Sequence, residues 1–205
     1  DCRSDVKREE EAAEFLLHRR VDGLIMMPTG AEKKVFDRFR KSGRPVVLID
    51  RRMENGDCDC VLVDNEGAAQ NAVKRLMKKG HKKIGMITGP DNVYTARERQ
   101  RGYELAIQES SKARSAQQSD LKGKTDRTKL LADGNYTIAG GAKAMRKLYE
   151  DNPDMTAVFI SNYEMTVGAM MEINDLGIKV PEQLSVIGFD NMDFARAVVP
   201  RLTIV

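Results

Sequence analysis

Short apolar runs that alternate with amphipathic segments constrain this chain more than any other feature. Six runs are candidate strands, at residues 21–27, 45–50, 60–63, 83–88, 157–161 and 184–189. Six segments with helical spacing of apolar residues lie between them, at residues 8–19, 32–42, 66–79, 96–109, 139–150 and 165–176. Most of the strand candidates are nearly continuous apolar runs, which is typical of parallel strands covered on both faces. The alternation predicts a doubly wound α/β architecture.

Glycines at the ends of the predicted helices agree with this interpretation. Gly43, Gly80 and Gly177 each follow a helical segment, where a left-handed residue ends a helix most easily. Asp64 or Asn65 is suited to begin the helix that follows them. A division into two units is expected near Gly89-Pro90, which gives domains at residues 1–89 and 90–205.

Residues 110–128 are polar and lack apolar periodicity, so they are expected to form an exposed connection. They contain Gly123-Lys124-Thr125, which superficially resembles a phosphate-binding loop. Such a loop needs a glycine five residues before the Gly-Lys pair, and Gln118 occupies that place. A nucleotide-binding site is therefore not expected here.

Composition excludes several classes of protein. The 205 residues include 34 Lys and Arg against 31 Asp and Glu, a net charge of +3 that does not by itself mark a nucleic-acid binder. Hydrophobic residues make up 41%, which is too apolar for a disordered chain, yet no run is long enough for a membrane helix. Cys2, Cys58 and Cys60 are too few for a disulfide scaffold and lack nearby ligands for a metal, so we expect free thiols in a reducing, cytoplasmic compartment.

An ordered set of segments resembles the effector-binding core of the LacI/GalR family of bacterial transcription regulators. The segments are VDGLIMMP (21–28), RPVVLIDR (44–51), GHKKIGMITGP (80–90), TARERQRGYELAI (95–107), DGNYTIAGGAKAM (133–145), AVFISNYEMTVGAMMEINDLGIKVPEQLSVIGFDN (157–191) and VPRLTIV (199–205). Each segment alone is a weak signal, but their common order along almost the whole chain is highly specific.

The resemblance implies a periplasmic-binding-protein-like fold, in which two Rossmann-like subdomains enclose a ligand cleft. That agrees with the α/β pattern, because open parallel sheets bind ligands beyond the carboxyl ends of their strands. The resemblance also implies an incomplete core, without the helix-turn-helix domain, the first strand and helix, and the C-terminal crossovers. The first sheet would then lack its central strand.

Arg99 and Asp190 are the leading candidates for effector binding. Arg97 and Arg101 are four residues apart and share a helix face, so Arg99 points elsewhere. The resemblance places Arg99, three residues before Gly102, against the effector, where its planar fork of donors suits hydroxyls or anions. It likewise places Asp190 in the cleft, where a carboxylate accepts hydrogen bonds from sugar hydroxyls. A solvated helix face for Arg99 and a capping loop aspartate for Asp190 are the structural alternatives.

Asn162 is a third candidate, because its amide both donates and accepts hydrogen bonds. It is also placed to cap the helix through Met165, and both roles are compatible. The family usually has Asn-Asp where this chain has Asn162-Tyr163, so the usual local network is altered. Tyr163 offers a ring face to a sugar, or packs.

Weaker candidates lie at the other strand ends. Asp50 and Asp64 each follow a predicted strand of the first unit, where they either line the cleft or serve as capping and solvent-exposed residues. Tyr94 and Thr95 follow the expected crossing between the units and are candidates for the cleft edge.

An enzyme is not expected, because the chain has no GxSxG or HExxH motif, no Cys–His pair and no recognisable acid–base pair. No catalytic residue, metal or cofactor is therefore assigned. The resemblance instead implies a dimeric regulator, expected to be a repressor, whose small-molecule effector controls operator DNA binding. Sugars, sugar phosphates and purines are open as effectors, and some relatives use a phosphoprotein co-regulator. A sugar-binding protein of a transport system, with the same fold, is the alternative.

Overall fold

The computed structural model describes residues 5–29, 33–53, 58–117, 130–191 and 193–205. The chain divides into two compact units. Unit 1 comprises Asp1–Asp64 with Asn92–Thr95, and unit 2 comprises Asn65–Asp91 with Ala96–Val205. Each unit is built on a parallel sheet of its own, in agreement with the predicted α/β class.

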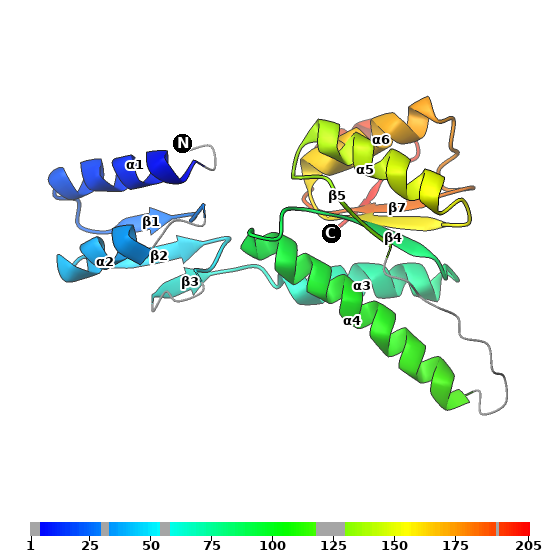
Figure 1. The fold of residues 1–205 in the computed structure, drawn as a ribbon, viewed down its shortest axis with the longest axis horizontal. Coiled ribbons are helices and arrows are strands. Elements are labelled where there is room, and N and C mark those ends of the chain that lie inside the picture. The colour runs from blue at the N-terminus through cyan, green and yellow to red at the C-terminus, as the bar shows by residue number, and fades with distance from the viewer. Residues whose placement is uncertain (1–4, 30–32, 54–57, 118–129, 192) are drawn as a thin grey trace. The chain divides into compact units, whose positions relative to one another are not determined.

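Unit 1 has a three-stranded sheet in the order β1-β2-β3. Its elements are α1 (Val6–His18), β1 (Leu24–Met26), α2 (Lys33–Lys41), β2 (Val46–Ile49) and β3 (Asp59–Val61) (Figure 1). Asp5 begins α1, because its carboxylate accepts the Arg8 backbone N–H at 3.1 Å. Buried residues from both helices and from β2 form the core of the unit: Ala13, Phe39, Val46 and Leu48.

Both helices of unit 1 pack on the same face of its sheet. Ile25, Ile49 and Val61 point to the other face and are exposed. Within the described residues this sheet is therefore covered on one face, whereas strands covered on both faces were expected. The double covering expected for most strands is therefore incomplete in unit 1, because apolar runs show that a strand can be buried on both faces without showing which element covers it.

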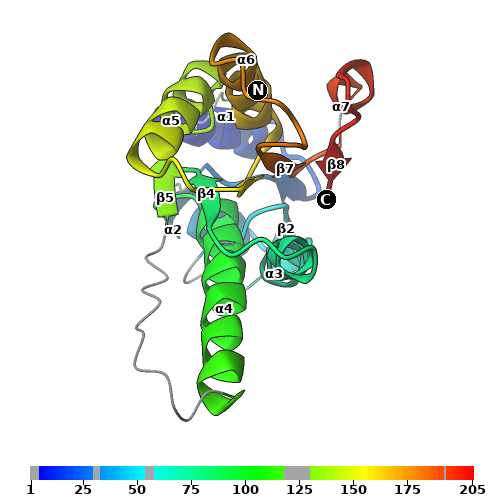
Figure 2. The ribbon, with the colours of Figure 1, turned by 90° about the vertical axis from the view of Figure 1, so that its right-hand side faces the viewer.

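Unit 2 has a five-stranded sheet in the order β5-β4-β6-β7-β8. Its strands are β4 (Ile84–Thr88), β5 (Leu130–Asp133), β6 (Ala157–Ile160), β7 (Ser185–Gly188) and β8 (Thr203–Ile204). Its helices are α3 (Asn65–Lys78), most of α4 (Tyr94–Gln117), α5 (Ile138–Asp151), α6 (Tyr163–Asp175) and α7 (Phe194–Ala197). Figure 2 shows α5 and α6 on one side of the strands and α3 and α4 on the other. Separate apolar cores fill these two sides, as a doubly wound sheet requires.

Several local predictions are confirmed. Gly43, Gly80 and Gly177 have φ angles of 73°, 95° and 67°, so each takes the left-handed conformation expected after a helix. Neither Cys58 nor Cys60 is in a disulfide, and both pack on the core of unit 1. Cys2 lies outside the described residues.

The division of the chain differs from the expected boundary at residues 89 and 90. β4 pairs with both β5 and β6, so it belongs to the second sheet, and α3 packs on the core of that sheet. Unit 2 therefore begins at Asn65, and the chain crosses between the units before α3 rather than after β4 alone. An apolar strand carries no local mark of the sheet that it joins, so the sequence pattern misplaced this boundary.

The segment between residues 110 and 128 was also only partly anticipated. α4 continues to Gln117, so residues 110–117 are helical rather than an irregular connection. The remainder of that segment, including Gly123-Lys124-Thr125, lies outside the described residues. The short elements β5, α7 and β8 were not predicted, because runs of four residues or fewer carry little periodicity.

Candidate functional site

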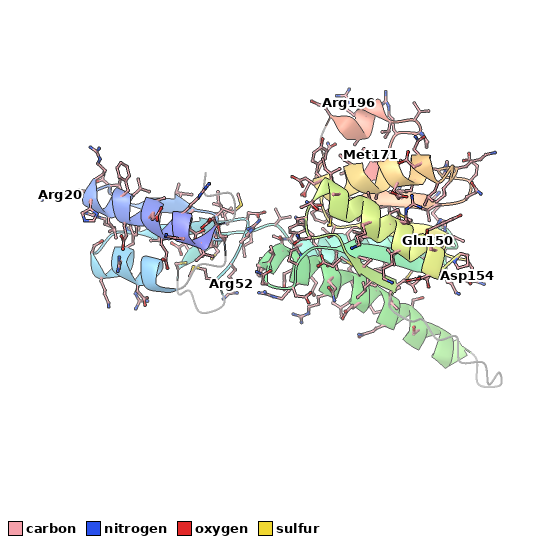
Figure 3. The ribbon with its side chains drawn as sticks, turned by 45° about the horizontal axis from the view of Figure 1, so that its top comes forward. Arg20, Arg52, Glu150, Asp154, Met171 and Arg196 are labelled. Carbon is pink, nitrogen blue, oxygen red and sulfur yellow. The ribbon has the colours of Figure 1, made fainter. Side chains whose placement is uncertain are left out.

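Polar groups of unit 2 meet at the carboxyl ends of its strands. Ser161 and Asn162 follow β6, Asp190 follows Phe189 at the end of β7, and Asn65 and Arg99 come from the first parts of α3 and α4. Ligands of parallel α/β sheets bind at this edge. Figure 3 shows Glu150 and Asp154 at the carboxyl end of α5, where the chain leads into the amino end of β6.

Arg99 is the centre of this group. Its side chain is only 7% exposed, whereas that of Arg101 is 67% exposed, which agrees with the helical spacing. Its Nε donates to Asn65 Oδ1 at 2.8 Å, and its Nη1 donates to the Ser161 carbonyl at 2.6 Å and to Asp190 Oδ2 at 3.3 Å. The two N–H groups of Nη2 make no hydrogen bond with the described residues. Arg99 therefore presents one nitrogen with two donors that the described residues do not use.

The guanidinium also stacks on an aromatic ring. Arg99 Cζ lies 3.7 Å from the centroid of the Phe189 ring, in cation–π geometry. Phe159 supports Phe189 edge-on, with ring centroids 6.3 Å apart and planes inclined by 68°. Three hydrogen bonds and one aromatic face thus determine the plane of the guanidinium.

Asp190 combines an ion pair with an accessible carboxylate. Its side chain is 46% exposed, although one oxygen contacts Arg99. Its φ of 69° is unusual for a residue other than glycine, and its backbone N–H donates to the Val205 carbonyl at 3.2 Å. A strained residue that is held by the neighbouring strand is typical of functional positions.

Asn162 is occupied as a helix cap. Its Oδ1 accepts the Met165 backbone N–H at 3.0 Å, and its Nδ2 donates to Glu164 Oε2 at 2.5 Å. The side chain is buried, so the capping alternative is what the structure shows directly. Tyr163 is the first residue of α6 and is half-buried beside this cap. Ligand contact by either residue stays a prediction.

The other predicted site residues belong to unit 1. Asp50 follows β2 with a φ of 64°, its backbone N–H donates to the Val61 carbonyl at 3.0 Å, and its carboxylate lies 3.6 Å from Arg51 Nε. Asp64 is exposed at the last position of that part of unit 1, and Thr95 is buried at the last position of its second part. Tyr94, the first residue of α4, is half-buried. The structure brings together Arg99 and Asp190, while these residues stay separate predictions.

The sequence did not identify two groups of residues at this edge, namely two residues that contact Arg99 and two that follow β5. Asn65 was considered only as a helix cap, and Phe189 only as part of a strand, yet both contact Arg99. Asn135 and Tyr136 follow β5 with φ angles of 51° each, and the Tyr136 ring lies so close to Gly89 that a Cβ there would come within 2.3 Å of it. No pattern in the sequence marks such contacts, since they join residues far apart in the chain.

Within the described parts of the chain, no three His, Cys, Asp or Glu side chains come close enough together to hold a metal ion. None of the helices described combines the length and apolar character that crossing a membrane requires.

Known proteins share both the sequence pattern and the fold. Residues 73–205 match the family described as periplasmic binding protein-like domain. A sugar-binding transcriptional regulator of the LacI family from Escherichia coli, solved in complex with phosphate, is 30% identical and superposes with a TM-score of 0.76 over 97% of this chain and 68% of that chain. The chain belongs to the LacI family.

Other relatives agree with this assignment. The HTH-type transcriptional regulator AscG of Escherichia coli (strain K12) is 31% identical over 204 residues, which is 99% of this chain and 57% of AscG. The transcriptional regulator CelR, solved in complex with cellobiose, is 27% identical with a TM-score of 0.80 over 96% of this chain and 57% of that chain. The chain thus spans about half the length of the curated relatives that it matches.

Proposed function

We propose that residues 1–205 are the effector-binding part of a LacI-type transcriptional regulator, most simply a repressor. A small molecule binds at the carboxyl edge of unit 2, and its binding controls the affinity of the whole regulator for operator DNA. The observation that carries this proposal is the buried Arg99 with an unused Nη2, paired with the accessible carboxylate of Asp190. Together these groups offer two donors and an acceptor side by side.

The chemistry of this pair favours a neutral ligand with several hydroxyl groups. A hydroxyl accepts a hydrogen bond from Nη2 and donates one to Asp190, so neighbouring hydroxyls of a sugar match both groups. The Arg99 charge is already paired with Asp190, and an anionic group at Nη2 would also approach that carboxylate. We therefore rank sugars above sugar phosphates and purines. Because relatives have been solved with cellobiose and with phosphate, the test below includes both neutral sugars and phosphate-containing compounds.

The effector changes DNA binding only by its unequal affinity for two arrangements of the regulator. Asn162, Tyr163, Thr95, Asp50 and Asp64 are further proposed contacts of the effector. A homodimer with helix-turn-helix domains, outside residues 1–205, would read two half-sites of an operator.

The chain is not an enzyme, it uses no cofactor or membrane, and it acts in the cytoplasm, where its target DNA and the free thiols of Cys58 and Cys60 are both accommodated. A phosphoprotein co-regulator is an additional partner of the kind open to this family. The named relatives are transcriptional regulators, which favours this function over a transport binding protein.

Thermal unfolding with a panel of probes tests the ligand class. The probes are cellobiose, D-ribose, D-galactose, glucose 6-phosphate, adenosine and inorganic phosphate. A probe at about 100 times its dissociation constant is expected to add about 2.7 kcal/mol to the free energy of unfolding. Neutral sugars are expected to give the largest shift in Tm.

Two variants and one control assign the shift to the site. Arg99→Lys and Asp190→Asn are each expected to weaken binding about tenfold or more, because each removes charge-assisted hydrogen bonds. Arg101→Lys, on the same helix and exposed, keeps its charge beside Glu66 and is expected to bind as the wild type does. A shift that survives both site variants would place the ligand elsewhere, and a panel without any shift would contradict the proposed ligand classes.

A further inference from the structure

The two helices that hold the Arg99 site both begin where the chain enters unit 2. Asn65 is the first residue of unit 2 and of α3, and Ala96, where the chain enters unit 2 again, is three residues before Arg99 in α4. The bond from Arg99 Nε to Asn65 Oδ1 therefore joins the first parts of two helices through residues that are 34 positions apart in sequence.

Asn65 is well suited to hold a guanidinium. It is 2% exposed, so its carboxamide is shielded from water, and its Oδ1 accepts from Nε at 2.8 Å. A hydrogen bond from a charged donor to a buried acceptor is stronger than one between neutral groups. Because Nε is the nitrogen nearest the aliphatic chain, fixing it also determines the direction in which Nη1 and Nη2 point.

Gly102 allows the two helices to approach closely enough for this bond. A Cβ at Gly102 would lie 2.2 Å from the Glu66 carbonyl oxygen and 2.9 Å from both Ala69 Cβ and the Gln70 backbone nitrogen. Two of those three atoms are backbone atoms, which cannot rotate away. Arg99 and Gly102 are three residues apart, so both lie on the face of α4 that packs on α3.

We propose that Asn65 and Gly102 are positioning residues for Arg99. Gly102 allows α3 to pack closely on α4, and Asn65 then holds Nε by a hydrogen bond. Phe189 determines the plane of the guanidinium, so that Nη2 is presented to the effector in one orientation. The proposal deepens the proposed function and rests on it for the identity of the ligand. The orientation of Arg99 in the free protein does not depend on that identity.

The arginine Nε–H resonance in ¹H–¹⁵N NMR spectra of the 205-residue chain gives a test without ligand. Arg99→Lys identifies the signal by its disappearance. In the wild type this signal is expected to exchange slowly with water and to be shifted by the ring current of Phe189. Asn65→Ala is expected to speed its exchange at least about tenfold, because the acceptor is gone. Asn65→Asp restores an acceptor oxygen and is expected to keep the protection.

Two further variants separate positioning from general stability. Gln70→Ala removes another hydrogen bond between α3 and α4, from Gln70 Nε2 to Glu109 Oε1 at 2.9 Å, without touching Arg99. It is expected to leave the Arg99 signal unchanged. Gly102→Ala is expected to lose the protection as Asn65→Ala does. If Asn65→Ala does not fold, Asn65→Ser is used instead, since serine suits a helix start but is too short to reach Nε.

Ligand binding completes the test. With the sugar that gives the largest Tm shift in the panel above, Asn65→Ala is expected to raise the dissociation constant about tenfold and Gln70→Ala to leave it unchanged. An Arg99 Nε–H that stays protected in Asn65→Ala, or loses protection equally in Gln70→Ala, would overturn the positioning role. If no panel probe binds the wild type, the proposed ligand class fails, and the NMR comparison still decides the role of Asn65.

Discussion

At the scale of single residues, buried polar groups connect elements that apolar packing alone would leave loosely defined. Tyr103 on α4 is almost completely buried, and its hydroxyl donates to the Ile84 carbonyl of β4 at 2.8 Å. Burial raises the pKa of Tyr103 to about 12, against a smaller lowering by a hydrogen bond with the Leu130 backbone. The hydroxyl thus links α4 to the strands at the middle of unit 2.

This pKa predicts a dependence of stability on pH. Unfolded tyrosine ionises near pH 10, whereas folded Tyr103 holds its proton to about pH 12, so the free energy of unfolding falls between these values. The loss is about 2–3 kcal/mol. Tyr103→Phe is expected to be less stable than the wild type by about 1 kcal/mol at about pH 9 and to become the more stable of the two by about pH 12, because the wild type alone loses stability as Tyr103 ionises. Denaturant unfolding of both proteins across this range measures the difference, and a constant difference would contradict the prediction.

At the scale of elements, the start of α6 serves two requirements at once. Asn162 lies between β6 and α6 and caps α6, while the carbonyl of the preceding residue, Ser161, accepts a hydrogen bond from Arg99. Thr166 adds a second tie, since its Oγ1 donates to the Asn162 carbonyl at 2.6 Å. The junction of β6 and α6 therefore positions one acceptor of the Arg99 site through the geometry of a helix cap.

Substitution of the cap separates its structural role from ligand contact. Asn162→Ala is expected to lower the free energy of unfolding by about 1 kcal/mol, because the Met165 N–H loses its acceptor. Asn162→Ser keeps a capping oxygen and is expected to retain most of that stability. Thr137→Ala, at the N-cap of α5, provides a matched loss of similar size. If Asn162 also contacts the effector, Asn162→Ser weakens binding without a comparable loss of stability, whereas unchanged binding in Asn162→Ser would show a cap only.

At the scale of the whole molecule, the elements that the structure describes cover the sheets of the two units to different extents. Unit 2 carries helices on both faces, whereas Ile25 and Val61 of unit 1 are 71% and 66% exposed. Large apolar residues are exposed on unit 2 as well, such as Met171 on α6, which Figure 3 labels. Met171 is not part of an uncovered sheet face, and exposed apolar residues of that kind are normal.

The uncovered face predicts binding of a hydrophobic dye. The chain of 205 residues is expected to enhance the fluorescence of anilinonaphthalene sulfonate under native conditions, because this face offers contiguous apolar surface. Replacing Ile25 and Val61 together by threonine is expected to reduce the enhancement by about half or more while the circular dichroism spectrum is kept. Met171→Thr is the control and is expected to change little. Equal enhancement in the double variant and the wild type would contradict the assignment to this face.

Features of this fold that depend on local interactions could be predicted from the sequence. Alternating apolar periodicity is a local property, so the order of the major strands and helices was predicted correctly, with most ends shifted by a few residues and the end of α4 by eight. Helix-ending glycines were predicted for the same reason. Arg99 and Asp190 were found through family motifs, and the structure brings their side chains to 3.3 Å across 91 positions of sequence.

Only the tertiary structure decided the features that depend on partners far away in the chain. β4 is an apolar run that suits either sheet, and its pairing with β5 and β6 moved the unit boundary from residue 89 to Asn65. Asn65 and Phe189 contact Arg99 because the start of α3 and the end of β7 lie beside it. No local sequence pattern encodes that placement. The sequence by itself determined which elements form, since backbone propensity and periodicity act within a few residues. The sheet that each strand joins, and the side chains that surround one arginine, are determined by packing among all the elements together.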